Sequence, residues 1–294
     1  MKSIILSVAV LIALAAPCHS ETIYGVTNLQ QLVTFDSETR VATTTSLSGF
    51  SLLGEALLTI DVRPDTGELY GLSNQNNLYI IDPSTGGRTQ VGSTLSPGAP
   101  GFVRSIDFNP TVDRIRLLSS NNVANNNLRV NPNDALVTPD TQLAFAVGDP
   151  NFGDAPAVTN SAYTNSRPGV TMTALFDIES GNDVLVRQNP ANAGTLTTIG
   201  PLGFDIVASG GFTGFDISGA TGTAYLVGNK LGTGGLTANS LYSVNLATGA
   251  ASLLGPVTGV NGSFRDIAVA DVIPEPTTLT FALLATLFSW RRNR

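Results

Sequence analysis

Two stretches of the sequence decide the fold, LYIIDPSTGG at residues 78–87 and LYSVNLATGA at residues 241–250. Each begins with the apolar alternation of a half-buried strand and continues into a Thr-Gly turn. A second short strand follows, and each copy runs to a closing glycine at the same offset, Gly92 in the first and Gly255 in the second. The pattern predicts a β-hairpin that the chain uses repeatedly.

Less regular copies of this hairpin begin at residues 32, 128 and 185. A second recurring element precedes the hairpins, namely an apolar-Asp-apolar triplet followed by a turn and another strand. The triplets are Ile60-Asp61-Val62, Ile106-Asp107-Phe108 and Phe215-Asp216-Ile217. Together the two elements make a unit of four short strands in roughly 45–55 residues, a period typical of propeller blades. No segment shows sustained helical periodicity.

The sequence therefore predicts an all-β fold, a β-propeller of four-stranded blades. Residues 264–270 begin a unit that has no room to finish, whereas the segment after residue 20 lacks a first strand. Pairing of these N- and C-terminal strands would complete one blade and close the ring without a free edge. We then expect five blades: this composite one and four that begin near Leu57, Arg104, Val158 and Thr213.

Two alternatives to the five-bladed ring stay open at this point. A strand within residues 146–160 would make six blades. A β-sandwich is the main alternative fold, but it would not explain the internal repeat.

The composition excludes several functional classes. The chain has 294 residues with one Cys, one His and a net charge of −7. A disulfide scaffold needs paired cysteines, and a zinc site needs clustered His or Cys ligands. A negative net charge has the wrong sign for a nucleic-acid partner.

Residues 1–20 are predicted to be a signal peptide. Lys2 supplies the positive charge, and an apolar run over residues 4–16 is followed by small residues. We place the cleavage between Ser20 and Glu21. This segment implies passage through the Sec translocon and removal by signal peptidase.

Residues 273–294 form a second distinct segment, outside the propeller domain that we place at residues 21–272. Pro274, Glu275 and Pro276 mark a linker that continues neither a strand nor a helix. The apolar run that follows is about 21 Å long as a helix, short of the ~30 Å hydrocarbon core. The chain ends in a basic cluster, Arg291, Arg292 and Arg294, which would stay on the cytoplasmic side.

This three-part tail resembles the PEP-CTERM sorting segment of exported proteins of Gram-negative bacteria. The resemblance implies that an exosortase recognises the tail and removes it. It also implies transient anchoring in the inner membrane, followed by delivery to the cell surface or the extracellular space. Association with extracellular polysaccharide is part of the same implication.

The two ends hold the only Cys, the only His and the only Trp of the chain, Cys18, His19 and Trp290. The propeller domain is therefore left without any residue for a His- or Cys-based nucleophilic site. Removing Glu275 and four basic residues of the ends leaves 21 acidic and 11 basic residues, a net charge of −10.

The propeller domain resembles a bacterial domain family of unknown function, the one numbered forty-three ninety-four. The matching stretches are IDFNPTVDRIR at 106–116, YTN at 163–165, QNP at 188–190, GTLT at 194–197 and GFDISG at 214–219. The resemblance implies a propeller-like fold and export. It carries no known activity and no site residues.

The best candidates for chemistry are Asp61, Asp107 and Asp216, at equivalent positions of first strands. First strands line the channel of a propeller, so these carboxylates would converge there. They would then bind a hard cation or serve glycoside hydrolysis. The competing interpretation is structural, with each aspartate bonded to backbone amides. The ring of aspartates is incomplete, because Tyr163 and Ala268 hold the other two positions.

A second oxygen-rich cluster comprises Asp149, Asn151 and Asp154, whose oxygens are of the kind that Ca²⁺ prefers. The spacing matches no complete calcium loop, so a surface turn is the default interpretation. Calcium is the one cofactor that the sequence leaves open.

Two classes of function remain. The favoured one is a non-enzymatic surface or matrix protein with a binding or structural propeller. The alternative is a carboxylate-dependent glycan hydrolase or lyase that uses Asp61, Asp107 or Asp216. The enzyme requires at least two of these carboxyl groups about 5–10 Å apart and facing an open pocket. The binding protein requires them to be buried and bonded to the backbone.

Overall fold

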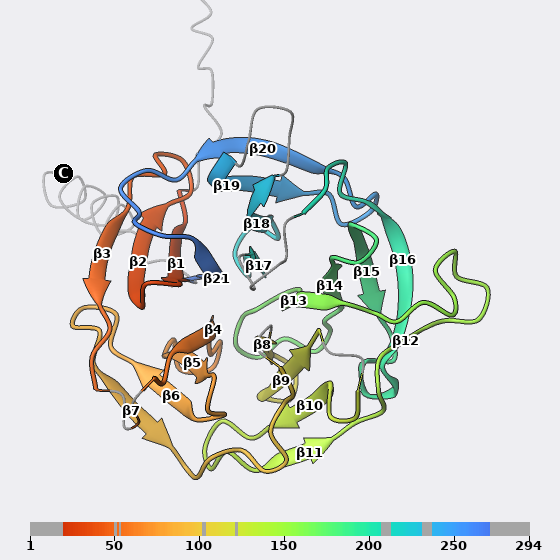
Figure 1. The fold of residues 1–294 in the computed structure, drawn as a ribbon, viewed down its shortest axis with the longest axis horizontal. Coiled ribbons are helices and arrows are strands. Elements are labelled where there is room, and N and C mark those ends of the chain that lie inside the picture. Colours follow the sequence, from red (N-terminus) through yellow and green to blue (C-terminus); the bar gives the residue numbers. More distant parts are fainter. Residues whose placement is uncertain are drawn as a thin grey trace, which may run out of the picture.

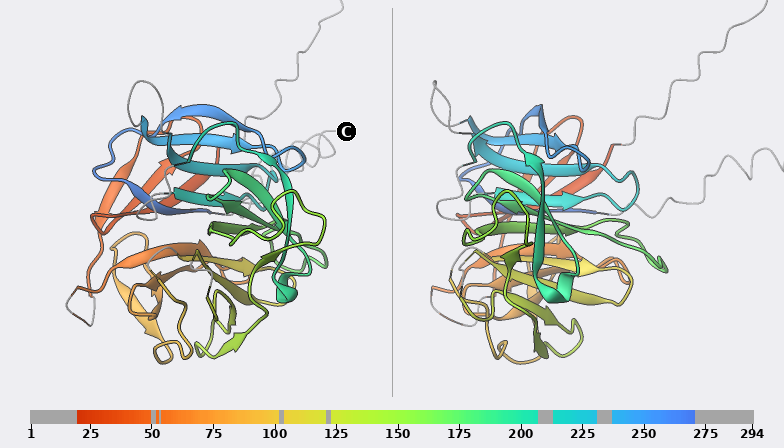
Figure 2. Two further views of the ribbon diagram at one scale, coloured as in Figure 1. Left: turned by 45° about the vertical axis from the view of Figure 1, so that its right-hand side comes forward. Right: turned by 90° about the vertical axis from the view of Figure 1, so that its right-hand side faces the viewer.

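The computed structural model describes residues 20–49, 52, 54–101, 104–120, 123–206, 213–230 and 237–270. These residues form five antiparallel sheets of four strands each, one of them extended by a short fifth strand, arranged as blades around a central axis (Figure 1). Seen edge-on, the strands run from one face of the ring to the other (Figure 2). The predicted five-bladed β-propeller is confirmed. Helical structure in the described part of the chain is limited to the 3-10 turn η1 (Ala191–Ala193).

The blades are numbered here in chain order, and their strands are given from the inner to the outer edge. Blade 1 contains β21 (Phe264–Val269), β1 (Thr22–Thr27), β2 (Gln31–Asp36) and β3 (Thr43–Ser46). Blade 2 contains β4 (Leu57–Val62), β5 (Leu69–Ser73), β6 (Leu78–Ile81) and β7 (Arg88–Val91). Blade 3 contains β8 (Arg104–Asn109), β9 (Arg114–Ser119), β10 (Asn127–Val130) and β11 (Val137–Pro139). Blade 4 contains β13 (Val158–Tyr163), β14 (Leu175–Glu179), β15 (Val184–Gln188), β16 (Thr195–Pro201) and β12 (Ala144–Phe145). Blade 5 contains β17 (Thr213–Ile217), β18 (Ala224–Lys230), β19 (Thr237–Val244) and β20 (Ala251–Pro256).

Blade 1 closes the ring as the sequence predicts. Strand β21 pairs with β1 in antiparallel register from Ile23 opposite Val269 to Thr27 opposite Phe264. Just beyond the strand, the amide of Ala270 donates to the carbonyl of Thr22 at 2.9 Å. The inner strand of this blade is thus supplied by the C-terminal end of the described chain.

The region considered for a sixth blade contributes to blade 4 instead. The short strand β12 lies immediately before it and pairs in parallel with β16, Ala144 opposite Thr195. Within residues 146–160 the only strand residues belong to the start of β13, the inner strand of blade 4, so the six-bladed alternative is wrong.

The Thr-Gly turns that define the repeat pack against the preceding blade. Gly86 has a φ of +70°, and a Cβ there would lie 2.4 Å from the carbonyl oxygen of Ser46 in β3. Gly249 has a φ of +81°, and its Cβ would lie 2.3 Å from the carbonyl oxygen of Gly200 in β16. Both positions need glycine for the left-handed turn and for the close approach between blades.

The hydrophobic core is divided among the interfaces between blades. The Tyr70 ring of blade 2 lies edge-on to the Phe108 ring of blade 3, with centroids 5.1 Å apart. Apolar clusters of the same kind fill the interfaces between blades 4 and 5, blades 5 and 1, and blades 1 and 2. The interface between blades 3 and 4 differs, since Leu118 is the one residue that blade 3 contributes to its cluster. Polar side chains occupy much of this interface, as described below.

The predicted signal peptide, residues 1–20, lies outside the described residues except for Ser20, and the predicted tail, residues 273–294, lies wholly outside them. Across the described part of the chain, no helix is both long enough and apolar enough to cross a membrane.

Candidate functional site

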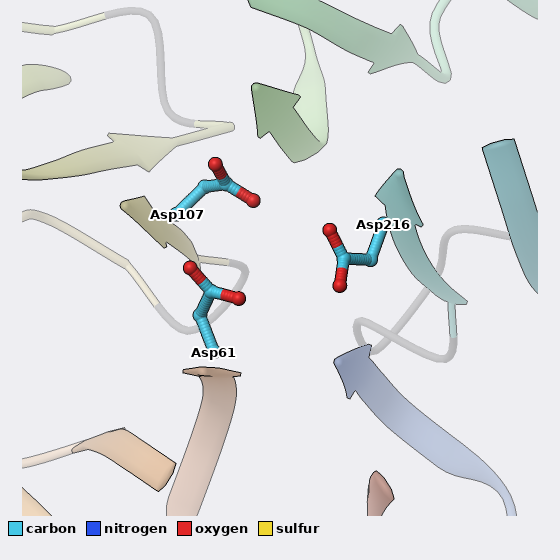
Figure 3. Close-up of side chains that lie close together, drawn as sticks. All are labelled: Asp61, Asp107 and Asp216. Atoms are coloured by element: carbon cyan, nitrogen blue, oxygen red, sulfur yellow. The ribbon is translucent and has the colours of Figure 1, made fainter. Parts of the chain in front are cut away.

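The three predicted aspartates come together around the axis of the ring (Figure 3). Asp61, Asp107 and Asp216 stand on the inner strands β4, β8 and β17, and each is almost fully buried. One carboxylate oxygen from each lies within 4.8 Å of the others. The equivalence of the three positions in the sequence thus corresponds to a single cluster in space.

Each of these carboxylates holds the inner strand of the next blade. The amide of Phe108 donates to Asp61 Oδ2 at 2.6 Å, and the amide of Tyr163 donates to Asp107 Oδ1 at 2.8 Å. Asp216 Oδ2 accepts from the amide of Val269 at 2.5 Å in the same way. Inner strands of neighbouring blades are therefore linked by side chain-to-backbone bonds.

This bonding pattern corrects one sequence assignment. Tyr163 donates its amide as Phe108 does, so the position equivalent to Asp107 is Ala162 and not Tyr163. Ala268, which precedes the donor Val269, is confirmed as the remaining position. The assignment was shifted by one residue, and because side chains alternate along a strand, that shift places the side chain on the opposite face.

A second ring of polar side chains, which the sequence interpretation missed, lies two residues before the first. Its members are Thr59, Ser105, Asn160 and Asp266. Thr59 Oγ1 accepts from the amide of Ile106 at 2.9 Å, and Ser105 Oγ accepts from the amide of Ser161 at 2.9 Å. The signal in the sequence was a small or polar residue two positions before each aspartate or its equivalent.

Asp266 is the charged member of this second ring. Its Oδ2 accepts from the amide of Ile60 at 3.1 Å and from the hydroxyl of Thr59, while Oδ1 lies 3.2 Å from the Asn160 amide nitrogen. Blade 5 carries Gly214 at the equivalent position. A Cβ on Gly214 would lie 2.5 Å from the backbone nitrogen of Ile267, so glycine permits β17 and β21 to approach.

The buried carboxylates bind protons more tightly than usual. Burial, and then the charge of Asp216, raises the pKa of Asp61 well above its ordinary value. Burial, and then the charge of Asp61, raises the pKa of Asp107 well above its ordinary value. Burial raises the pKa of Asp266 likewise. Burial and the neighbouring negative charges thus both favour the protonated form of Asp61 and Asp107.

The cluster does not meet the needs of a complete calcium site. Three side chains supply three nearby oxygens, whereas Ca²⁺ takes six to eight. These carboxylates also accept bonds from backbone amides. The backbone therefore accounts for the position of each carboxylate without a metal ion.

The residues of the second oxygen-rich cluster lie apart from the channel, on the loop before β13. Asp149 accepts from the Thr198 amide at 2.6 Å, from the Thr198 hydroxyl at 2.9 Å and from the Asn151 amide at 2.9 Å. Burial raises the pKa of Asp149, but the hydrogen bonds from Thr198 and Asn151 outweigh it and leave the pKa below its ordinary value. Asp154 is exposed, and its amide donates to the Asn151 carbonyl at 3.0 Å. In this structure residues 149–154 form a turn that is hydrogen-bonded to β16 through Asp149 and Thr198.

Asp177 of β14 is another buried carboxylate that the sequence interpretation missed. It is 0% exposed, and within the described residues neither of its oxygens has a hydrogen-bond partner. Burial raises its pKa well above the ordinary value, and the charge of Arg116 opposes that only in part. Asp177 pairs in register with Ser161, whose hydroxyl lies 3.1 Å from that of Ser105 in blade 3. It therefore belongs to the polar interface between blades 3 and 4.

The fold and the inner-strand carboxylates define the chain as a five-bladed β-propeller closed by its two terminal strands. The sequence profile described as "Domain of unknown function (DUF4394)" matches residues 31–268. The chain therefore belongs to this family, as the motifs indicated. No curated protein matches the sequence.

Similar solved structures come from proteins that are distant in sequence. TolB from Acinetobacter baumannii has a TM-score of 0.48 and 15% identity, over 85% of this chain and 66% of TolB. A structural genomics protein of unknown function from Bacteroides thetaiotaomicron has a TM-score of 0.48 and 13% identity, over 87% and 68%. YCF48 bound to D1 peptide has a TM-score of 0.38 and 14% identity, over 78% and 62%.

Proposed function

We propose that this protein is an exported, non-enzymatic binding propeller of the cell surface or extracellular matrix. The observation that carries the proposal is the bonding of Asp61, Asp107 and Asp216 to the backbone of neighbouring blades. They are close enough together for acid–base chemistry, yet they are buried and accept bonds from the amides of the next blade. Such carboxylates hold a ring together, and the ring then presents a rigid surface.

Export rests on the two terminal segments. In this proposal the signal peptide, residues 1–20, directs the chain to the Sec translocon, and signal peptidase cleaves between Ser20 and Glu21. The tail, residues 273–294, anchors the chain transiently in the inner membrane until an exosortase removes it.

The position of the chain ends in the ring supports this processing. Thr22 and Ala270 are joined by a backbone hydrogen bond, so both segments leave the propeller at neighbouring points. Val269 is the last residue of β21, so the Ser20–Glu21 bond and the tail at residues 273–294 both lie outside the strands. Cleavage at both ends would leave every blade complete.

The processing is tested by the mass of the protein recovered from the cell surface of a Gram-negative host that carries an exosortase. The expected product begins at Glu21, lacks the tail and has no indole fluorescence, because Trp290 is the only tryptophan. A surface product whose mass includes residues 273–294, or one that shows indole emission, would overturn the sorting proposal.

The proposed ligand is extracellular polysaccharide, and the competing function is a carboxylate-dependent glycan hydrolase or lyase. The two are separated by incubating the protein with polysaccharide and measuring both retention and chain length. We expect retention without shortening. Shortening that disappears in Asp107→Asn, with the melting temperature unchanged, would favour the enzyme.

A further inference from the structure

A polar cavity of about 350 Å³ lies between blades 3 and 4. Its lining includes the arginines Arg114, Arg116 and Arg129 and the polar residues Asn109, Tyr163 and Asn192. Its volume is at the lower end of the range for small-molecule sites. Tyr163 connects it to the channel, since its amide is bonded to Asp107 while its side chain lines the cavity.

The floor of the cavity is fixed in place by hydrogen bonds. Arg116 is 2% exposed and donates to Asp140 Oδ2 at 2.7 Å, to Asn127 Oδ1 at 2.8 Å and to Asn192 Oδ1 at 2.7 Å. Arg129 donates to both oxygens of Asp140 at 2.8 Å. These bonds hold two guanidinium groups in set positions before any ligand arrives.

The cavity is positively charged on a negatively charged domain. Asp140 forms ion pairs with both Arg116 and Arg129, so one carboxylate faces two cations. Arg114 adds a third cation. Among the described residues it has no carboxylate partner, because the carboxylate of the adjacent Asp113 is held by Arg63. Among the described residues that line the cavity there is no acid.

The lining also offers donors suited to neutral oxygens. The Asn192 side-chain oxygen is committed to Arg116, which leaves its amide N–H groups to face a ligand. Tyr163 supplies a hydroxyl, which accepts from Arg116 Nε at 3.5 Å and keeps its own O–H to donate, and Asn109 supplies a second amide. Guanidinium groups match the two oxygens of a carboxylate, while amides and hydroxyls match those of a sugar ring.

We propose that this cavity binds a carboxylate-bearing sugar, such as one uronic acid unit of an acidic polysaccharide. Arg114 and the partly exposed Arg129 take the carboxylate, and Asn192 and Tyr163 take ring hydroxyls. The choice of a polysaccharide as the source of the sugar rests on the proposed function. The binding chemistry itself does not depend on export.

The test is calorimetric titration of the full-length protein with an oligogalacturonate, beside an uncharged dextran oligosaccharide and sodium sulfate. We expect the oligogalacturonate to bind, and Arg114→Gln to weaken that binding about 10–100-fold, as for the loss of charge-assisted hydrogen bonds. Arg187→Gln is the matched control, because Arg187 is an exposed arginine of β15 outside the cavity. This control should bind as the wild type does.

Three results would overturn the inference: no binding of oligogalacturonate, equal weakening by both substitutions, or sulfate binding as tightly as the sugar. Binding of dextran without oligogalacturonate would leave the proposed polysaccharide function standing while this inference fails. Oligogalacturonate binding that depends on Arg114, in a protein whose tail is never processed, would support the cavity assignment and count against sorting.

Discussion

Replacing Asp177 by leucine is expected to stabilise the protein. Leucine has the same branched shape as aspartate, and blades 3 and 5 already carry leucines at the equivalent register positions. Asp177 lies opposite Ser161, just as Leu117 lies opposite Ile106 and Leu226 lies opposite Phe215. The substitution therefore places in blade 4 the residue type that two other blades use.

The magnitude follows from the surroundings of the carboxyl group. Asp177 is fully buried and has no hydrogen-bond partner for either oxygen within the described residues. An unsatisfied buried polar group costs about 1–3 kcal/mol in proteins. For a domain of this size each kcal/mol shifts the melting temperature by about 2–4 °C, so Asp177→Leu should raise it by roughly 2–12 °C.

The gain also depends on pH. The pKa of Asp177 is raised in the folded state, whereas in the unfolded state it is about 3.9, the value for an exposed aspartate. Between these two pKa values the folded state binds more protons than the unfolded state. The contribution of Asp177 to stability therefore falls as pH rises through this interval. Asp177→Leu removes that dependence, so its advantage over the wild type should be greater at pH 7 than at pH 4.5.

The assay is thermal denaturation followed by far-ultraviolet circular dichroism at both pH values. Asp266→Leu is the matched control, because Asp266 is equally buried but bonded to Thr59 and to the amide of Ile60. This control should lower the melting temperature. If Asp177→Leu lowers it at pH 7 as well, Asp177 has a partner in solution and the reasoning is refuted.

Three other predictions concern the inner strands. Because the pKa values of Asp61 and Asp107 are raised, the wild type should have a higher free energy of unfolding in urea at pH 5 than at pH 7, by at most about 1.4 kcal/mol per pH unit for each extra proton bound. Equal values at the two pH values would contradict this. Gly214→Ala should destabilise by at least about 1–3 kcal/mol, because its Cβ meets a backbone nitrogen at 2.5 Å. Gly228→Ala is its control, because the atoms nearest to a Cβ there are 3.8 Å away. Equal free energies of unfolding in urea for the two variants would show that the close approach at Gly214 does not require glycine. Thr59→Val should lower the free energy of unfolding in urea by about 1–3 kcal/mol, because it leaves the Ile106 amide unpaired. An unchanged urea midpoint would count against a hydrogen-bonding role for the second ring.

Blades 2 and 5 were predictable because they repeat both signals, and the other blades because each carries a less regular copy of at least one. A triplet such as Ile106-Asp107-Phe108 marks an inner strand, and a hairpin with a Thr-Gly turn marks the outer pair. The repeat therefore fixed the starts of all four continuous blades, and the unfinished unit at residues 264–270 indicated how the fifth is closed.

The second ring could not be predicted, because different residue types make the same kind of hydrogen bond in it. Thr59, Ser105 and Asp266 all accept a hydrogen bond from a backbone amide of the next blade, yet they share only a polar side chain at a fixed offset, which is no distinctive motif. Tyr163 was assigned to the aspartate position because its strand lacks the aspartate that sets the register in blades 2, 3 and 5.

The arginine cavity depends on contacts between residues that are distant in the chain. Arg116 and Asn192 are 76 positions apart and meet only because blades 3 and 4 are neighbours in the ring. Their spacing corresponds to no local motif, so no pattern in the sequence pointed to the site.

The central claim is that the channel aspartates hold the ring together and that the protein binds polysaccharide without cleaving it. The most direct measurement compares wild type and Asp107→Asn for retention of an acidic polysaccharide and for its chain length after incubation. We expect equal retention and unchanged chain length for both proteins. Shortening of the polysaccharide by the wild type, lost in a folded Asp107→Asn protein, would contradict the claim.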